Sequence, residues 1–174
     1  MRILAICGSL RARSSNLAAL EAAARLAPPP LEVVLYGGLA GLPPFNPDFD
    51  GEHPPLPVVE LRQAVAGAEA LMISSPEYAR GTAGTLKNAL DWLVSSTEFP
   101  GKPVAVINAS PRATHADAAL RLTLETMSAR IIEDASITLP LLGRNLDADG
   151  ILTDAELSRP LLSALQALQR AIAA

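Results

Sequence analysis

The fold is indicated most directly by the stretch ILAICGSLRARSSN at residues 3–16. Its first part, Ile3–Ile6, is apolar throughout, which is typical of a strand in a parallel sheet that helices cover on both faces. Gly8 then allows a sharp turn of the backbone. Ser14–Asn16 carry the side chains that cap the start of a helix. A buried strand, a glycine turn and the start of a helix are therefore expected in direct succession.

The rest of the chain repeats this alternation, with short apolar segments between longer amphipathic ones. Such an order implies right-handed crossovers and a doubly wound, five-stranded parallel α/β sheet with helices on both faces. Residues 1–174 are expected to form one domain, because the length suits a single core and no repeat or linker interrupts it. Strands are predicted at Ile3–Cys7, Leu31–Tyr36, Ala70–Ser74, Val104–Asn108 and Arg130–Ile137, and helices at Leu17–Leu26, Val58–Ala66, Thr85–Ser95, Ala116–Met127 and Asp154–Ala173.

Composition excludes several classes of function. The net charge is −4 and the basic residues are scattered, whereas a nucleic-acid surface needs a basic stripe. No run of about 20 apolar residues predicts a membrane span. The chain has one cysteine, Cys7, and no recognisable signal peptide, so a cytoplasmic location is expected. Cys7 is interpreted as a core residue, and His53 and His115 lack the carboxylate spacing of a metal site.

The loop after the first strand has the chemistry of a phosphate site. Ligands in such folds lie at the carboxyl ends of the strands. Hydroxyl groups, an amide and guanidinium groups at a helix N-terminus suit a phosphate dianion. Neither a Walker loop nor a Gly-x-Gly-x-x-Gly fingerprint occurs, which favours a mononucleotide. The alternative is a capped helix with exposed arginines. The candidate phosphate ligands are Ser9, Arg11, Ser14, Ser15 and Asn16.

The loop after the third strand reads SPEYARGTAG at residues 75–84. A flat ring system needs an apolar platform, which Pro76 and Tyr78 can supply, and backbone groups for its polar edge. The N–H groups of Glu77 to Gly81 could serve that edge. The alternative is a turn anchored by a packed tyrosine.

These motifs together resemble one known family. The pattern GSLRxxSxN at residues 8–16, followed by PEY at 76–78 and LKNALDW at 86–92, is similar to the NADPH-dependent FMN reductase family. The resemblance implies a flavodoxin-like fold with strand order 2-1-3-4-5, FMN as cofactor, and NADPH or NADH as co-substrate. It also implies a small acceptor, such as a quinone, free flavin, azo compound or metal oxyanion, reduced by ping-pong hydride transfer.

The resemblance further implies roles for particular positions. Ser9, Arg11, Ser14, Ser15 and Asn16 would hold the FMN phosphate, and Pro76, Glu77, Tyr78, Arg80 and Gly81 would line the isoalloxazine ring and ribityl chain. The helix Leu86–Trp92 would lie at the interface of a homodimer or homotetramer. The chain departs from the family at Ala79, where many relatives have Asn, and in the loop at 108–115, which has no glycine. Within that loop Ser110 is the expected flavin contact, with Arg112 as a second candidate.

No protein side chain is assigned as a catalytic acid or base, because hydride transfer is the chemistry of the cofactor. Glu77 and His115 are titratable groups in the ligand loops, but neither is given a catalytic role. Two other functions stay open at this point. One is an electron-transfer flavodoxin that docks on partner enzymes, although such chains are usually more acidic and flank the ring with aromatic residues. The other is a relative of the same fold that has lost FMN.

Overall fold

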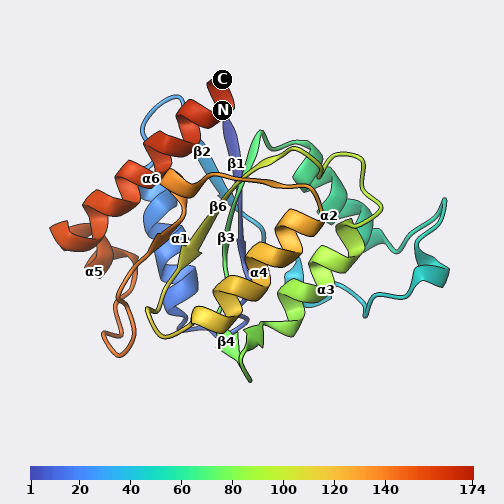
Figure 1. Cartoon of the computed structure of the whole chain (residues 1–174), viewed down its shortest axis with the longest axis horizontal. Helices are drawn as coiled ribbons and strands as arrows, with labels where there is room; N and C mark the ends of the chain where they lie inside the picture. The colour runs from blue at the N-terminus through green and yellow to red at the C-terminus, as the bar shows by residue number, and fades with distance from the viewer.

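We describe a computed structural model of the chain, which covers residues 1–174 (Figure 1). The order of its parallel main strands is the expected 2-1-3-4-5. Cys7 lies beside Ser74 and Ile73 beside Val106, so the first, third and fourth main strands end at the same edge of the sheet. Across the sheet the strands are β2 (Glu32–Leu35), β1 (Arg2–Cys7), β3 (Ala70–Ser74), β6 (Pro103–Asn108) and β7 (Arg130–Ile131).

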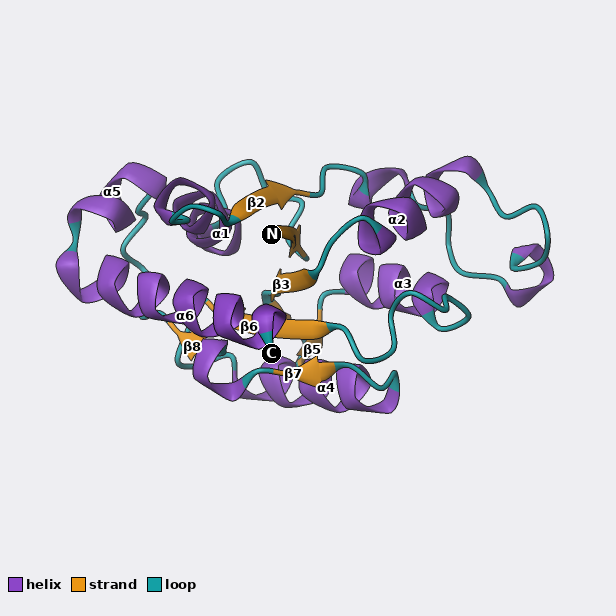
Figure 2. Ribbon diagram, turned by 90° about the horizontal axis from the view of Figure 1, so that it is seen from above, coloured by secondary structure: helices purple, strands orange, loops and turns teal.

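Helices cover both faces of this sheet, as Figures 1 and 2 show. One side carries α1 (Ser15–Leu26), α5 (Ala148–Thr153) and α6 (Ala155–Ala173), and the other carries α2 (Leu56–Ala66), α3 (Gly84–Leu93) and α4 (Thr114–Thr126). Strand β1 sends Ile3 and Ala5 into the first core and Leu4 and Ile6 into the second, as its alternation requires. None of the helices has both the length and the apolar character that a bilayer crossing needs.

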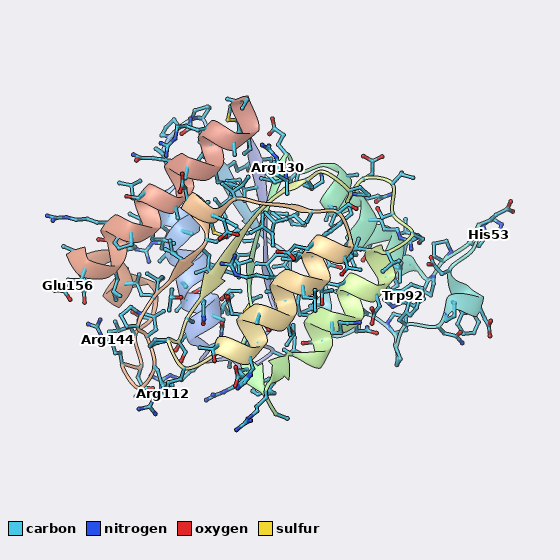
Figure 3. All side chains as sticks on the ribbon, in the orientation of Figure 1. His53, Trp92, Arg112, Arg130, Arg144 and Glu156 are labelled. Carbon is cyan, nitrogen blue, oxygen red and sulfur yellow. The ribbon has the colours of Figure 1, made fainter.

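Between β2 and α2, residues 37–55 form a long arm with two 3₁₀ turns, Leu39–Gly41 and Pro47–Phe49. The arm extends beyond the helices in Figure 2, and Figure 3 labels His53 near its tip. Helix α3 holds its base. The side chain of Asn88 accepts the N–H of Phe45 at 2.7 Å and donates to the carbonyl of Pro43 at 2.9 Å. The indole N–H of Trp92 donates to the same carbonyl at 2.8 Å.

A second anchor joins the arm to α2. The guanidinium of Arg62 donates to Asp50 Oδ1 at 2.6 Å, and the Ser95 hydroxyl donates to Asp50 Oδ2 at 2.8 Å. Burial alone would raise the pKa of Asp50, but these hydrogen bonds and the charge of Arg62 outweigh it and lower that pKa below its usual value. The ionised carboxylate therefore stabilises the folded arm.

The end of the sheet differs from the prediction. The segment 130–137 is not one strand but β7 and β8 (Ile137–Thr138), with a 3₁₀ turn at Glu133–Ala135 between them. Ser136 accounts for the break: its hydroxyl accepts the N–H of Val106 at 3.1 Å and donates to the carbonyl of Ile132 at 2.9 Å. A side chain thus replaces part of the backbone ladder. Both short strands still pair with β6 in parallel.

Three helices begin two residues before the predicted start: α1 at Ser15, α2 at Leu56 and α4 at Thr114. The short helix α5, which was not predicted, comes directly before α6. Its N-cap is Asp147, whose Oδ1 accepts the N–H of Gly150 at 2.9 Å. A single capping carboxylate was too weak a signal to predict a helix of this length.

Candidate cofactor site

The loops that follow β1, β3 and β6 enclose a cavity of about 430 Å³ at the carboxyl edge of the sheet. This is where doubly wound sheets bind ligands, and the volume falls within the usual range for small-molecule sites. Most of the predicted site residues line it: Ser9, Arg11, Ser14, Ser15, Asn16, Pro76, Glu77, Tyr78 and Ser110. Arg80 and Gly81 are not among the lining residues.

One wall of the cavity is the N-terminus of α1. Ser14 is the N-cap, and its hydroxyl accepts the N–H of Leu17 at 3.4 Å. The N–H groups of Ser15 and Asn16 belong to the first turn, where no earlier helical carbonyl is available to them. Ser9 shapes the preceding turn by accepting the N–H of Arg11 at 3.4 Å. Free N–H groups and the positive end of the helix dipole together favour a bound anion.

Asn16 also ties this wall to the sheet. Its Oδ1 lies 2.9 Å from the hydroxyl of Ser74, and that hydroxyl lies 2.6 Å from the carbonyl oxygen of Ile107. Asn16 and Ser74 are both buried. The contacts join the start of α1 to β3 and β6, so Asn16 positions the helix N-terminus as well as lining the cavity.

Three guanidinium groups make the cavity electropositive. Arg11, Arg13 and Arg112 all line it, and the side chains of all three are free of ion pairs within the protein. The only carboxylate that lines the same cavity is Glu77. Because the whole chain has a net charge of −4, this is a local surplus of positive charge against the overall trend.

Glu77 is engaged in holding α4. Its Oε2 accepts the N–H groups of His115 and Ala116, each at 3.0 Å. The residue before the helix, Ala113, has no side chain that could cap it. A carboxylate from the loop after β3 therefore caps the helix that follows β6 and fixes two walls of the cavity relative to each other.

Residues 77–82, which were expected to be a loop, form an antiparallel hairpin of β4 (Glu77–Tyr78) and β5 (Gly81–Thr82). Its two turn residues, Ala79 and Arg80, have φ of +49° and +58°. Such a turn matches the twist of a hairpin but normally uses Asn or Gly. Arg80 thus lies at the tip of the hairpin, which explains why it does not line the cavity. Tyr78 is 51% exposed, so its ring is not the packed anchor of the alternative interpretation.

The glycine-free loop after β6 is a compact polar turn. Asn108 Oδ1 accepts the N–H of Ser110 at 3.0 Å, and Asn108 Nδ2 donates to the carbonyl of Ala113 at 3.4 Å. The hydroxyl of Ser110 accepts the N–H of Arg112 at 3.2 Å. These side-chain hydrogen bonds hold the tight turn without a glycine. They also fix the backbone of Arg112.

Sequence reasoning missed part of the lining. Arg13, Ser75, Asn108, Ala109 and Ala113 lie beside predicted residues and could have been found by extending each loop. Leu142, Gly143 and Asn145 could not, because no motif marks them. They reach the cavity because the N–H of Leu139 donates to Asn108 O at 2.7 Å and the N–H of Leu141 to Ala109 O at 3.3 Å.

The surroundings of Cys7 are those of a core residue rather than those of an activated nucleophile. Burial raises the pKa of its thiol, although a hydrogen bond to the Ser9 carbonyl works in the opposite direction. Its sulfur lies 3.6 Å from that carbonyl and packs against the core between the sheet and α1. No group of three or more His, Cys, Asp or Glu side chains is placed to hold a metal ion.

Fold and site together define a class. A doubly wound parallel sheet, an anion-attracting helix N-terminus at its carboxyl edge and an exposed aromatic ring beside it are features of a flavodoxin-like protein that binds a mononucleotide. The donor set fits FMN, since hydroxyls, guanidiniums and free N–H groups would hold its phosphate, and Pro76 and Tyr78 would offer surface to its flat ring.

Comparison with known proteins gives the family. Residues 1–141 match the family described as NADPH-dependent FMN reductase. An NAD(P)H-dependent FMN reductase of Pseudomonas aeruginosa is 34% identical over 174 residues, which cover 97% of this chain and 94% of that protein. A 2-hydroxy-1,4-benzoquinone reductase of Burkholderia is 36% identical over 113 residues, 63% of this chain and 61% of that protein.

Among solved structures, the flavoenzyme NAD(P)H:(acceptor) oxidoreductase FerB of Paracoccus denitrificans superimposes with a TM-score of 0.83. It is 28% identical, and the superposition covers 99% of this chain and 97% of FerB. The chain belongs to the NADPH-dependent FMN reductase family, as its motifs predicted. It is accordingly an oxidoreductase with FMN as cofactor and NAD(P)H as co-substrate.

Proposed function

We propose that this enzyme takes hydride from NADPH or NADH and passes the electrons to a small acceptor by a ping-pong mechanism. The observation that carries the proposal is the cavity itself, which unpaired guanidiniums and the N-terminus of α1 line together with the exposed Tyr78. One open cavity suits two substrates that bind in turn. The names of the relatives support quinones and flavins as acceptors, and azo compounds and metal oxyanions belong to the same proposal.

Within this proposal the polar wall binds the phosphate and the hairpin side binds the ring. When bound, FMN supplies the hydride acceptance and donation. The phosphate ligands are Ser9, Arg11, Ser14, Ser15 and Asn16. The ring and ribityl chain contact Pro76, Glu77, Tyr78 and Ser110. The backbone at Arg80 and Gly81 shapes the hairpin that supports them, whereas the Arg80 side chain, which does not line the cavity, takes no part in binding.

The protein side chains in this scheme orient the cofactor and leave proton transfer to solvent and substrate. Glu77 supports this assignment, since one of its carboxylate oxygens already accepts two backbone N–H groups at 3.0 Å. His115 is exposed at the start of α4, where its backbone N–H is one of those donors. Neither side chain is needed as a catalytic acid or base.

A visible spectrum of the purified protein before and after NADPH is added under nitrogen tests the proposal. Bound flavin is expected to bleach directly, and air or a quinone is expected to restore its colour. The matched control is Arg11→Ala, which should purify with less flavin. Bound flavin that NADPH leaves oxidised would instead identify an electron-transfer protein, and a protein that binds no added FMN would refute the function altogether.

We further propose a homodimer or homotetramer that works in the cytoplasm. The apolar side of α3, including Leu86 and Trp92, is buried within this chain, so this helix would contribute its opposite, polar side to the interface. Phe49 and Leu56, which are 60% and 69% exposed on and beside the arm, support such an interface. Light scattering at micromolar concentration should give a multiple of the chain mass, and a monomer would contradict the proposal. The free thiol of Cys7 fits a reducing compartment.

A further inference from the structure

The cavity has cationic groups from two separate loops. Arg11 and Arg13 follow β1, whereas Arg112 follows β6. In the sheet β3 lies between those two strands, so the loops leave the sheet about 10 Å apart at the usual strand spacing. A phosphate held at the N-terminus of α1 can engage the first pair. Arg112 is then the cation available to the remainder of the ligand.

The loop holds Arg112 in place while leaving its guanidinium free. The backbone N–H of Arg112 donates to the Ser110 hydroxyl at 3.2 Å, and the N–H of Ala113 donates to the Ser110 carbonyl at 3.1 Å. Asn108, which is buried, fixes the same turn through Ser110 and Ala113. Figure 3 shows Arg112 at the lower edge of the molecule, near the turn between β6 and α4.

The charge of Arg112 is not neutralised by neighbouring acids. Glu77, across the cavity, accepts two N–H bonds from α4. Asp117, in the first turn of α4, pairs with Arg121 at 2.8 Å. Arg80, the other arginine near the ring side, belongs to the hairpin tip and is not a lining residue. Among the cations outside the phosphate wall, Arg112 is thus the one that lines the cavity.

We infer that Arg112 stabilises the negative charge that the flavin gains on reduction, a role separate from phosphate binding. Hydride from NAD(P)H brings two electrons and one proton to oxidised FMN and leaves NAD(P)⁺. The reduced ring system therefore carries one extra negative charge until a further proton is taken up. A fixed guanidinium beside it binds this form more tightly than the oxidised form. The inference rests on the proposed placement of FMN.

The test compares Arg112→Gln, Arg112→Lys, Arg11→Gln and Arg80→Gln as FMN complexes. The two readouts are the dissociation constant of oxidised FMN and the two-electron midpoint potential measured against a reference dye. Arg112→Gln is expected to weaken reduced FMN about tenfold more than oxidised FMN, as befits a charge pair partly exposed to solvent. Tenfold corresponds to a potential about 30 mV lower for a two-electron couple.

The other variants separate the possible explanations. Arg112→Lys should recover most of the potential because it keeps the charge. Arg11→Gln should weaken both redox forms equally and leave the potential unchanged, and Arg80→Gln should match the wild type in both readouts. An unchanged potential in Arg112→Gln, or an equal fall in Arg80→Gln, would overturn the inference while leaving FMN binding intact. Failure of the wild type to bind FMN would instead refute the proposed function.

Discussion

Replacing Arg11 is expected to weaken FMN binding more than replacing Arg13, although the two residues lie in the same loop and both line the cavity. A hydrogen bond to a charged group contributes about 1.5–3 kcal/mol. Arg11 is exposed, so solvent screening favours the lower end of that range. At about 1.4 kcal/mol per factor of ten, Arg11→Ala should raise the FMN dissociation constant roughly tenfold.

The structure supplies the reason for the asymmetry. Arg13 also lines a second, smaller cavity of about 180 Å³, which it shares with the carboxylates of Glu21 and Asp147. Arg13 is therefore shared between two spaces, whereas Arg11 lines only the cavity of the phosphate wall. The N–H bond from Arg11 to the Ser9 hydroxyl also fixes its backbone beside the N-terminus of α1. For Arg13→Ala the expected loss is therefore smaller, about threefold.

Titration of apoprotein with FMN, followed by quenching of flavin fluorescence, measures both constants. Arg80→Ala is the matched control, because it removes an exposed guanidinium near the site that does not line the cavity. Circular dichroism confirms that each variant is folded. Equal dissociation constants for Arg11→Ala and Arg13→Ala would refute the reasoning, and so would a loss of similar size in Arg80→Ala.

Three further predictions follow from other parts of the structure. Glu77→Gln and His115→Ala, saturated with FMN, should keep the rate of flavin bleaching by NADPH in stopped flow; a fall of the 10²–10⁴-fold that a general acid or base contributes would show a missed catalytic group. Ala79→Asn should raise the free energy of unfolding in urea by about 0.5–1 kcal/mol, because Asn tolerates the left-handed conformation found there; a decrease would contradict this account of the turn. Asp50, whose pKa is lowered mainly by its contacts with Arg62 against the effect of burial, stabilises the fold above its unfolded pKa and loses this effect as pH falls through the folded value. The stability difference between wild type and Asp50→Asn should thus be constant near neutrality and shrink below about pH 4, and an equal difference in urea unfolding at pH 6 and pH 3 would argue against it.

Much of the fold could be predicted because the relevant signals are local. Ile3–Ile6 is apolar on both faces, which is typical of a covered parallel strand, and Ser14 marks the start of the next helix. The loops after β1 and β3 each follow a strand immediately in sequence. Since the ends of parallel strands meet at one edge, residues such as Ser9 and Pro76 were expected to come together, and they line one cavity.

Only the tertiary structure decided which residues complete that cavity. Leu142 and Asn145 reach it because a backbone pairing with the end of β6 draws their segment alongside, and no local pattern encodes such a long-range contact. Arg80 is placed at the hairpin tip by a left-handed turn that its own residue type does not favour. Glu77 is committed to capping a helix 38 residues further on, a partner that becomes available only after the sheet has formed. Sequence periodicity determines which face of an element is buried, whereas the partners of polar side chains depend on which loops the folded sheet brings within hydrogen-bonding distance.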